Sequence, residues 1–245
     1  MNIALIGHGK MGKEIEQAAA ARRLTIKQVF TSKNNLQGIG ITKQSLKDVD
    51  ICIDFSSAPA VVDNIEAVAD CGKNIVIGTT GWYDKLDDVK QIVKAKKIGL
   101  LYSSNFSLGM NIFCQIIASA AHAFDKFDAY DAAISEIHHK GKVDSPSGTA
   151  LTLGQIILQH LHRKKQVLYE TPHAVLKPEQ LHITSTRVGH VCGTHRVLFD
   201  SDADSIELVH TAKNRSGFAL GALLAAEWLK GKKGIFTMKD VLSSI

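Results

Sequence analysis

Short apolar runs alternate with segments of helical spacing over the first hundred residues of the chain. Each run is short enough for a buried β-strand, and glycine or polar residues follow its end. Strands that alternate with helices in this way predict βαβ units and a parallel sheet. The predicted strands are Ile3–Ile6, Thr25–Phe30, Ile51–Phe55, Asn74–Ile77 and Ile98–Tyr102.

The segments between these strands carry start and stop signals of α-helices. The first helix continues to about Arg23. The second opens at Ala58-Pro59, because proline is favoured in a first helical turn, and it ends near Cys71-Gly72. Tyr83–Lys97 is the third predicted helix.

The pattern changes after the fifth predicted strand. Leu108–Phe124 predicts one long apolar helix. Asp131–His138 alternates towards a strand and runs into a polar loop that contains a glycine. Ser147–His162 predicts a further helix, with Ser147 or Thr149 available as its N-cap.

Four strand-like runs then follow one another without helices between them. Such a succession predicts an antiparallel or mixed sheet, and therefore a second domain. The tail returns to helices, since Phe218–Leu229 is apolar and Thr237–Asp240 resembles a capping box. The four runs are Gln166–Tyr169, Leu181–Arg187, His195–Phe199 and Ser205–His210.

The composition adds limits on size and partners. The chain has 245 residues, 45% hydrophobic and 22% charged, which suits one large domain or two modest ones. The net charge of +5 is spread along the chain, so it fits either a solvated surface or attraction for an anionic ligand. No zinc-finger or aromatic RNA-binding motif is present, and no apolar stretch could span a bilayer. We therefore expect neither a nucleic-acid partner nor a membrane.

Cysteine usage bears on the compartment. The cysteines form no CxxC pair, and most of them lie in apolar runs, where a free thiol behaves as a small hydrophobe. This pattern is typical of a reducing cytoplasm. The apolar start Met1–Ile6 has no basic residue and runs directly into glycines, which predicts a strand rather than a signal peptide. The cysteines are Cys52, Cys71, Cys114 and Cys192.

A glycine-rich turn directly follows the first predicted strand. Glycines let the backbone turn tightly and approach a pyrophosphate, and the next helix offers N–H groups and partial positive charge. The spacing of the three glycines is that of G-x-G-x-x-G, but this motif alone is a weak signal, so a tight turn of any α/β protein remains the alternative. Its position favours dinucleotide binding. The candidate contacts are Gly7, His8, Gly9, Lys10, Met11 and Gly12.

The end of the second strand bears on which dinucleotide binds. An acidic residue there would accept the ribose hydroxyls of NAD, but Phe30–Asn34 contains no acid. Lys33 and the two hydroxyls before it could instead contact a 2′-phosphate, or Lys33 could be an ordinary loop lysine. This stretch favours NADPH over NADH.

Two more turns end strands of the same sheet. Ligands collect at the carboxyl ends of parallel strands, so three turns on one edge indicate more than any one of them. The further candidate cofactor contacts are Gly78, Thr79, Thr80, Ser103, Ser104, Asn105 and Phe106.

The segment Glu136–Ala150 gathers groups that handle protons. His138 and His139 are adjacent, so at a strand end they point to opposite sides. Lys142 follows in a loop, and Asp144 can orient a lysine or histidine nearby. An isolated histidine would be an ordinary core or surface residue. Two histidines and a lysine this close together favour an acid–base site near neutral pH.

The same segment offers an anion site. Pro146–Thr149 opens a helix whose first N–H groups point at whatever lies in the preceding loop. A helix N-terminus of this kind suits a carboxylate.

These motifs resemble those of dihydrodipicolinate reductases. The family signature has a histidine, a lysine four residues on and then Asp-x-Pro-Ser-Gly-Thr-Ala, and His138–Ala150 fills each of these positions. Gly78–Gly81 and Ser104–Ser107 match as well. Arg187–Gly189 and Gly193–His195 are similar to the family's substrate-domain strands. The resemblance extends along the whole chain.

The resemblance implies an α/β protein of two domains. Residues 1–104 and 217–245 would form a Rossmann-type dinucleotide-binding domain. Residues 105–216 would form an α+β substrate-binding and tetramerisation domain with a mixed open sheet. The implied reaction is NADPH- or NADH-dependent reduction of (hydroxy-)dihydrodipicolinate, a cyclic dicarboxylate, in lysine and diaminopimelate biosynthesis. A homotetramer without a metal is implied.

The resemblance also implies roles for single residues. His138 matches the catalytic acid/base, and Lys142 matches the catalytic proton donor. His139 matches a substrate contact. The residues that would hold a substrate carboxylate are Ser147, Gly148 and Thr149.

Two departures from the family pattern stand out. The signature usually begins with Glu-Ile or Glu-Val, and we align this pair with Ala133-Ile134, which predicts altered support behind the catalytic histidine. The family also often has an acidic–basic pair after the second strand, and the acid is missing here.

Two other functions remain open. Another two-domain dehydrogenase, of aspartate or homoserine type, would use a related nucleotide domain for a different acid, and Pro146–Thr149 argues against it. A nucleotide sensor without turnover would need neither His138 nor Lys142.

Overall fold

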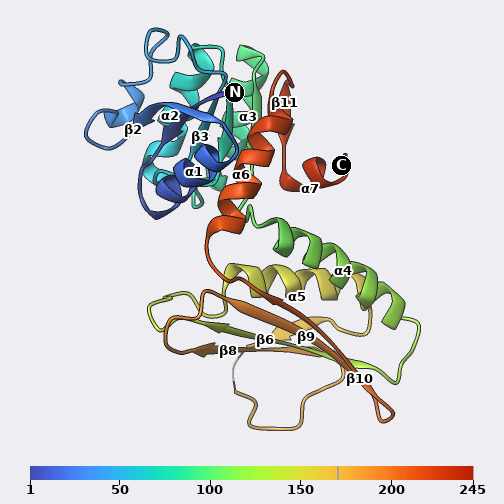
Figure 1. Ribbon diagram of the computed structural model, residues 1–245. Helices are drawn as coiled ribbons and strands as arrows, with labels where there is room; N and C mark the ends of the chain where they lie inside the picture. The colour runs from blue at the N-terminus through green and yellow to red at the C-terminus, as the bar shows by residue number, and fades with distance from the viewer. Residues whose placement is uncertain (170, 245) are drawn as a thin grey trace. The chain divides into compact units, whose positions relative to one another are not determined.

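The computed structural model describes residues 1–169 and 171–244. The chain forms two compact units (Figure 1). The first unit comprises Met1–Leu108 and Arg215–Ile245, and the second comprises Gly109–Asn214.

The first unit is built on a six-stranded parallel sheet in the order β11-β5-β4-β3-β1-β2. The chain places β2 on one side of β1 and β3 on the other. Ligands of open parallel sheets bind beside the carboxyl ends of the strands at such a change of direction. The strands are β1 (Asn2–Ile6), β2 (Thr25–Phe30), β3 (Ile51–Asp54), β4 (Asn74–Ile77), β5 (Gly99–Tyr102) and β11 (Gly234–Phe236).

Helices bury both faces of this sheet. Ala4 and Ile6 contribute to a core with α2 and α3, whereas Ile3 and Leu5 contribute to a second core with α1 and α6. Burial on both faces explains why the strands are continuous apolar runs rather than alternating ones. The helices are α1 (Lys10–Ala21), α2 (Ala58–Asp70), α3 (Leu86–Lys96), α6 (Ser216–Leu229) and α7 (Met238–Leu242).

The second unit contains a five-stranded mixed sheet in the order β10-β9-β6-β8-β7. β6 pairs parallel to β8 and antiparallel to β9. The helices α4 (Leu108–Phe124) and α5 (Gly148–His160) lie on the same face of this sheet (Figure 1). The strands are β6 (Asp131–His138), β7 (Gln166–Leu168), β8 (Gln180–Arg187), β9 (Thr194–Asp200) and β10 (Ser205–Thr211).

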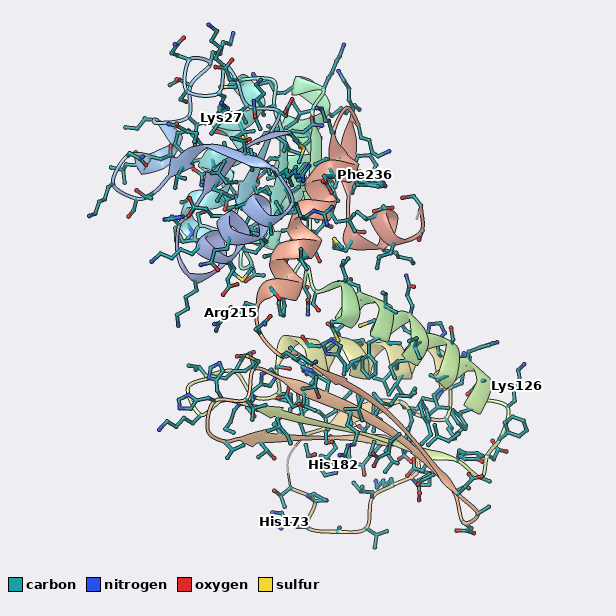
Figure 2. The ribbon with its side chains drawn as sticks, viewed as in Figure 1. Lys27, Lys126, His173, His182, Arg215 and Phe236 are labelled. Atoms are coloured by element: carbon teal, nitrogen blue, oxygen red, sulfur yellow. The ribbon has the colours of Figure 1, made fainter. Side chains whose placement is uncertain are left out.

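Alternation along β6 separates the two faces of the second sheet. Ile134, Glu136 and His138 are buried, whereas Ala133 alternates to the opposite face and is the register partner of His182 on β8. His182 lies on the side of the sheet away from the helices (Figure 2). This alternation decides which polar side chains can meet under α5.

The predicted fold class is confirmed, with local differences. The helix predicted over Tyr83–Lys97 begins as a 3₁₀ turn at Tyr83–Lys85 and becomes α-helical in α3. The strand β11 was not predicted, because three residues are too few to show a period. The capping box at Thr237–Asp240 is confirmed as the start of α7. In the described part of the chain, no helix is long and apolar enough to cross a membrane.

Candidate active site

The glycine turn after β1 is held by close backbone packing. Gly7 has φ +90°, and a side chain on it would collide with the carbonyl of Phe55. A side chain on Gly12 would collide with the carbonyl of Gly7. These two positions therefore require glycine for the turn itself.

Gly9 has a different place in this turn. It is the N-cap of α1, no side chain of the described residues caps the helix, and the first turn of α1 has no acidic residue. A Cβ on Gly9 would meet no described atom within 4 Å. The start of α1 is thus an open helix N-terminus with the chemistry of a phosphate site.

The other predicted residues of this turn surround the helix start. His8 Nε2 lies 2.8 Å from Glu16 Oε2. Glu16 lies in α1, more than one helical turn after the start of the helix. Lys10 is exposed, and Met11 packs partly against the core shared by α1 and α6.

The turns after β4 and β5 meet the first turn around Phe55. A side chain on Gly78 would collide with the ring of Phe55. That ring lies 5.8 Å from the ring of buried Phe106. Ser103 Oγ donates to the carbonyl of Asn105 at 2.9 Å, which shapes the turn after β5. Thr80 and Ser104 are exposed. Because β1, β4 and β5 run parallel in one sheet, the predicted residues of all three turns lie at the same edge of that sheet.

Asp54, which the sequence reasoning missed, ties the turn after β4 to the start of the segment after β3. Its fully buried carboxylate accepts hydrogen bonds from Thr79 Oγ1 at 2.7 Å, from the N–H and hydroxyl of Ser56, and from Asn64 Nδ2 at 2.9 Å. Asn35 Nδ2 donates to Asn64 Oδ1 at 2.8 Å, which extends the network to the loop after β2. Burial raises the pKa of Asp54, and these hydrogen bonds oppose the shift. The available signal was an acid at the end of an otherwise apolar strand.

Lys33 lies apart from that network, exposed in the loop after β2. Its N–H donates to Thr31 Oγ1 at 3.3 Å, and Asn34 Oδ1 accepts from the N–H of Thr31 at 2.7 Å. The hydroxyl of Thr31 therefore helps to form the turn that presents Lys33.

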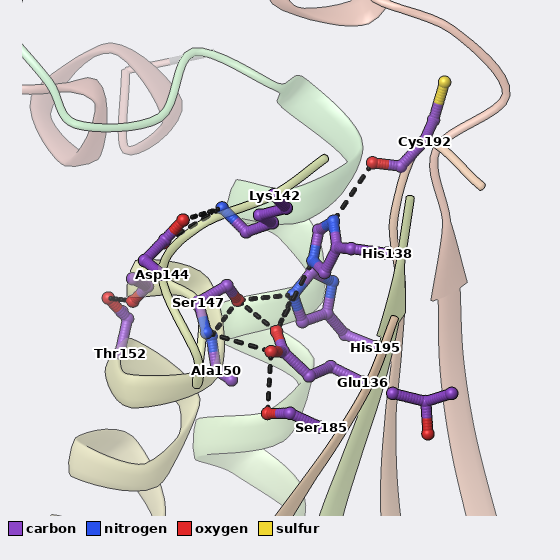
Figure 3. Close-up of polar contacts among 12 residues, drawn as sticks. Glu136, His138, Lys142, Asp144, Ser147, Ala150, Thr152, Ser185, Cys192 and His195 are labelled. Carbon is purple, nitrogen blue, oxygen red and sulfur yellow. Dashed lines mark hydrogen bonds and ion pairs between the residues drawn. The ribbon is translucent and has the colours of Figure 1, made fainter. Parts of the chain in front are cut away.

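In the second unit, Glu136 is the centre of the polar cluster (Figure 3). Its Oε1 accepts from the N–H of Ser147 at 2.9 Å, from Ser185 Oγ at 2.8 Å and from Arg187 Nη2 at 2.9 Å. Its Oε2 accepts from the hydroxyl of Ser147. Burial alone would raise the pKa of Glu136, but contacts with His195, Ser147 and Ser185 lower it well below its ordinary value. The buried carboxylate is therefore ionised.

The expectation of altered support at Ala133-Ile134 was wrong. Ala133 points to the sheet face without helices and pairs with His182 and Leu198. The Glu-Ile pair is Glu136-Ile137, and its carboxylate shares the helix-covered face with His138 because the two are two residues apart on β6. The alignment was three residues too early.

His138 ends β6 and is 8% exposed. Its Nδ1 lies 3.1 Å from the carbonyl of Cys192, which can only accept, so Nδ1 carries a hydrogen. Its Nε2 lies 3.4 Å from Glu136 Oε2, a charge contact without the geometry of a hydrogen bond. Burial lowers the pKa of His138 below its ordinary value, and the Glu136 carboxylate opposes this shift.

His195, on β9 directly opposite Glu136, is the second residue that sequence reasoning did not assign. It is 4% exposed, and its Nε2 lies 3.2 Å from Ser147 Oγ and 3.4 Å from Glu136 Oε2. The available signal was its alternation with the apolar Val197 and Phe199, which places it on the buried face.

The spacing of Glu136, His138 and His195 bears on metal binding. Their ligand atoms lie within 4.8 Å of one another, which is the spacing of a metal site. However, Arg187 already neutralises the carboxylate. We therefore interpret the three side chains as an acid–base cluster.

The loop after β6 holds Lys142 beside the cluster. Lys142 Nζ donates to both carboxylate oxygens of Asp144, at 2.7 and 2.9 Å, so the expectation that Asp144 orients a lysine is confirmed. The N–H of Lys142 donates to the carbonyl of His139 at 3.1 Å, which closes a tight turn. His139 is half-buried.

Ser147 is the N-cap of α5, one of the two caps expected from the sequence. Its hydroxyl accepts from the N–H of Ala150 at 3.1 Å while it donates to Glu136. The hydroxyl is therefore engaged within the protein. Gly148, which is exposed, and Thr149, which is half-buried, form the start of the helix beside it.

Sequence models of one known family match nearly the whole chain. A sequence model of the N-terminus of dihydrodipicolinate reductase matches residues 1–106, and a model of its C-terminus matches residues 109–242. The chain belongs to the dihydrodipicolinate reductase family. The family predicted from the sequence is thus confirmed.

Individual relatives agree over the full length. The chain is 41% identical over 245 residues to the 4-hydroxy-tetrahydrodipicolinate reductase of Christiangramia forsetii, covering 100% of this chain and 99% of that protein. It is 36% identical over 261 residues to the enzyme of that name from Archaeoglobus fulgidus, covering 99% and 100%. A dipicolinate-bound dihydrodipicolinate reductase from Paenisporosarcina sp. TG-14 shares the fold, with a TM-score of 0.77, 22% identity and 97% of each chain covered.

Proposed function

We propose that this protein catalyses NAD(P)H-dependent reduction of (hydroxy-)dihydrodipicolinate to tetrahydrodipicolinate in lysine and diaminopimelate biosynthesis. The observation that carries the proposal is the buried cluster of Glu136 and His138 beside the N-terminus of α5, in a chain of this family. The cluster handles protons, and the helix start suits a carboxylate. A cyclic dicarboxylate that accepts a hydride and a proton needs a proton donor and a site that binds its carboxylate.

The first unit fits a nicotinamide dinucleotide. The open start of α1 at Gly9 offers N–H groups to a pyrophosphate, and Gly7 and Gly12 keep the turn tight. The turns at Gly78–Thr80 and Ser103–Phe106 lie on the same edge of the sheet. When bound, the nicotinamide supplies the hydride. The protein supplies the geometry and the electrostatic environment.

In the second unit, we assign proton handling to His138 and Lys142. His138 is the acid/base, held by Cys192 and Glu136, and Lys142 is the proton donor, held by Asp144. A positioned acid lowers the barrier because reduction of a conjugated imine leaves negative charge that a proton must quench.

The backbone next to this acid–base cluster binds the substrate. We assign the cradle of a substrate carboxylate to the first turn of α5 at Gly148 and Thr149, and a further contact to His139. Ser147 holds this turn in place through Glu136 and the helix cap. The positive end of the helix dipole favours an anion there.

The assay that tests this function follows the absorbance of NADPH or NADH with the freshly made product of the preceding synthase. His138→Gln should lower kcat roughly 10²- to 10³-fold, because a positioned acid contributes about that much. Replacing Lys142 by Met should lower turnover and also weaken substrate binding. His173→Gln, in an exposed loop, is the control and should change neither constant.

Two outcomes would count against the proposal. Absence of cofactor oxidation would favour a dehydrogenase for a different acid or a nucleotide sensor. Full kcat/KM in both the His138 and Lys142 variants would show that the residue roles are wrong even within the right family.

For the cofactor, we propose a preference for NADPH that depends on Lys33. The lysine is exposed at the end of β2, where no acid in Phe30–Asn34 would repel a 2′-phosphate. Lys33→Ala should raise the KM for NADPH about five- to tenfold and leave the KM for NADH unchanged. Lys27→Ala, an exposed lysine of β2 itself, is the matched control. Equal changes in the KM for NADPH and in the KM for NADH would contradict the assignment of Lys33 to the 2′-phosphate.

We also propose a homotetramer in the cytoplasm, joined through the sheet of the second unit. The sheet face opposite α4 and α5 carries exposed apolar side chains, including Ile137 and Val209. Such a face is commonly covered by another copy of the chain.

A further inference from the structure

The polar cluster of the second unit contains two histidines that face one carboxylate. Nε2 of His138 and Nε2 of His195 each lie 3.4 Å from Glu136 Oε2. Their ring centroids are 5.1 Å apart in an edge-to-face arrangement. A single ionised oxygen therefore faces both rings (Figure 3).

The hydrogen bonds give the two rings opposite tautomers. The carbonyl of Cys192 makes Nδ1 of His138 the protonated nitrogen, so Nε2 is the atom that gains or loses a proton. Ser147 Oγ donates its one hydrogen to Glu136, so its 3.2 Å contact with His195 requires Nε2 of His195 to donate. His195 thus supports the carboxylate even when neutral, whereas His138 faces it with a lone pair.

The charge balance limits the cluster to few protons. Arg187 already pairs with the carboxylate at 2.9 Å. A proton on either histidine is attracted by Glu136, but a second one is opposed by the first at this separation. The charged or titratable groups that face His138 and its partner rings are Glu136 of β6, His195 of β9, Arg187 of β8, His210 of β10, and Lys142 and Asp144 of the loop.

From this geometry we infer that His195 is a positioning residue that, together with Glu136, controls the protonation of His138. The inference rests on the proposed function, in which His138 is the acid/base. His195 holds the carboxylate through Ser147, and its charge, when present, discourages a proton on His138. Glu136 acts in the opposite direction.

Opposite effects of the two neighbours provide the test. His195→Gln keeps a side-chain N–H donor for Ser147 but cannot carry charge, and Glu136→Gln keeps the shape of the carboxylate but not its charge. The pH at which His138 loses its proton should rise in His195→Gln and fall in Glu136→Gln. A merely structural role would move it in one direction or leave it unchanged.

Two measurements report this shift independently. The first is an NMR titration of the Cε1–H resonance of His138 in the free protein with ¹³C-labelled histidine, assigned by its loss in His138→Gln. The second is the pH dependence of kcat/KM, which should fall as pH rises through the same midpoint if His138 acts as an acid. His173→Gln is the matched control, since that histidine lies in an exposed loop.

A further variant separates charge from hydrogen bonding. His195→Leu removes both, so it should lower kcat about tenfold or more in addition to the shift, with a smaller change in KM. His195→Gln should retain most of kcat below the midpoint.

The outcomes are distinct. Shifts of opposite sign in the titration support the inference. Midpoints equal to the wild-type value in both charge variants, or shifts of the same sign, overturn it. Absence of reductase activity in the wild type would instead overturn the proposed function, and the titration in the free protein would still test the cluster.

Discussion

At the scale of single residues, Glu136 is the group on which the cluster of the second unit depends. It is 1% exposed and receives hydrogen bonds from Ser147, Ser185 and Arg187. The pKa of Glu136 is well below its ordinary value of 4.5 in the folded protein, so its contribution to stability is complete above that pH and is lost as the pH falls below it. Glu136→Gln should therefore cost about 3 kcal/mol at pH 7, because it breaks a buried charge pair.

The same substitution should cost progressively less as the pH falls below 4.5, because the unfolded wild-type chain then gains a proton on Glu136 that the folded protein does not hold. Urea unfolding at several pH values measures the difference. Glu207→Gln is the control: Glu207 is exposed in an ion pair with Arg196, and its loss should cost less than about 1 kcal/mol. A cost at Glu136 that does not vary with pH would contradict the argument.

At the scale of the element, the turn between β1 and α1 separates folding from binding. A side chain on Gly12 would collide with the carbonyl of Gly7, so Gly12→Ala should destabilise the first unit by about 2 kcal/mol or more. Gly9 has no described atom within 4 Å of the place its Cβ would occupy, and its backbone is extended. Gly9→Ala should therefore change stability by less than about 1 kcal/mol.

Gly9→Ala should nevertheless weaken NADPH binding roughly tenfold, because the methyl group would occupy the space over the helix N-terminus. Calorimetric titration gives the affinity, and urea unfolding gives the stability. An unchanged affinity for NADPH in Gly9→Ala would contradict binding of the pyrophosphate at this turn.

At the scale of the whole molecule, the open face of the second sheet should decide assembly. Val209, which is 49% exposed, lies on this face beside Arg196. Val209→Glu should reduce the proposed tetramer to smaller species in sedimentation velocity, because a buried unpaired charge is costly at an interface. Val175→Glu, in a loop where Val175 is 94% exposed, is the control and should leave the mass unchanged. A tetramer in both variants would place the interface elsewhere.

The sequence by itself determined the features that are local or periodic. Alternating runs predicted the parallel sheet, because strands and helices bury side chains at different periods. His138–Ala150 predicted the family and limited the cap of α5 to Ser147 or Thr149, since the signature lies in one contiguous segment. The cofactor contacts and the residue roles stay predictions, because they concern a bound ligand.

The tertiary structure decided what depends on strand pairing. Ser185 and Arg187 reach Glu136 from 49 and 51 residues away, and His195 reaches Ser147 from 48 residues away. The periodicity of the sequence does not specify which strands are neighbours or in which register they pair. For the same reason the alignment to Ala133 could slip by three residues unnoticed, whereas the register of β6 places Glu136 under His138 and leaves Ala133 on the other face.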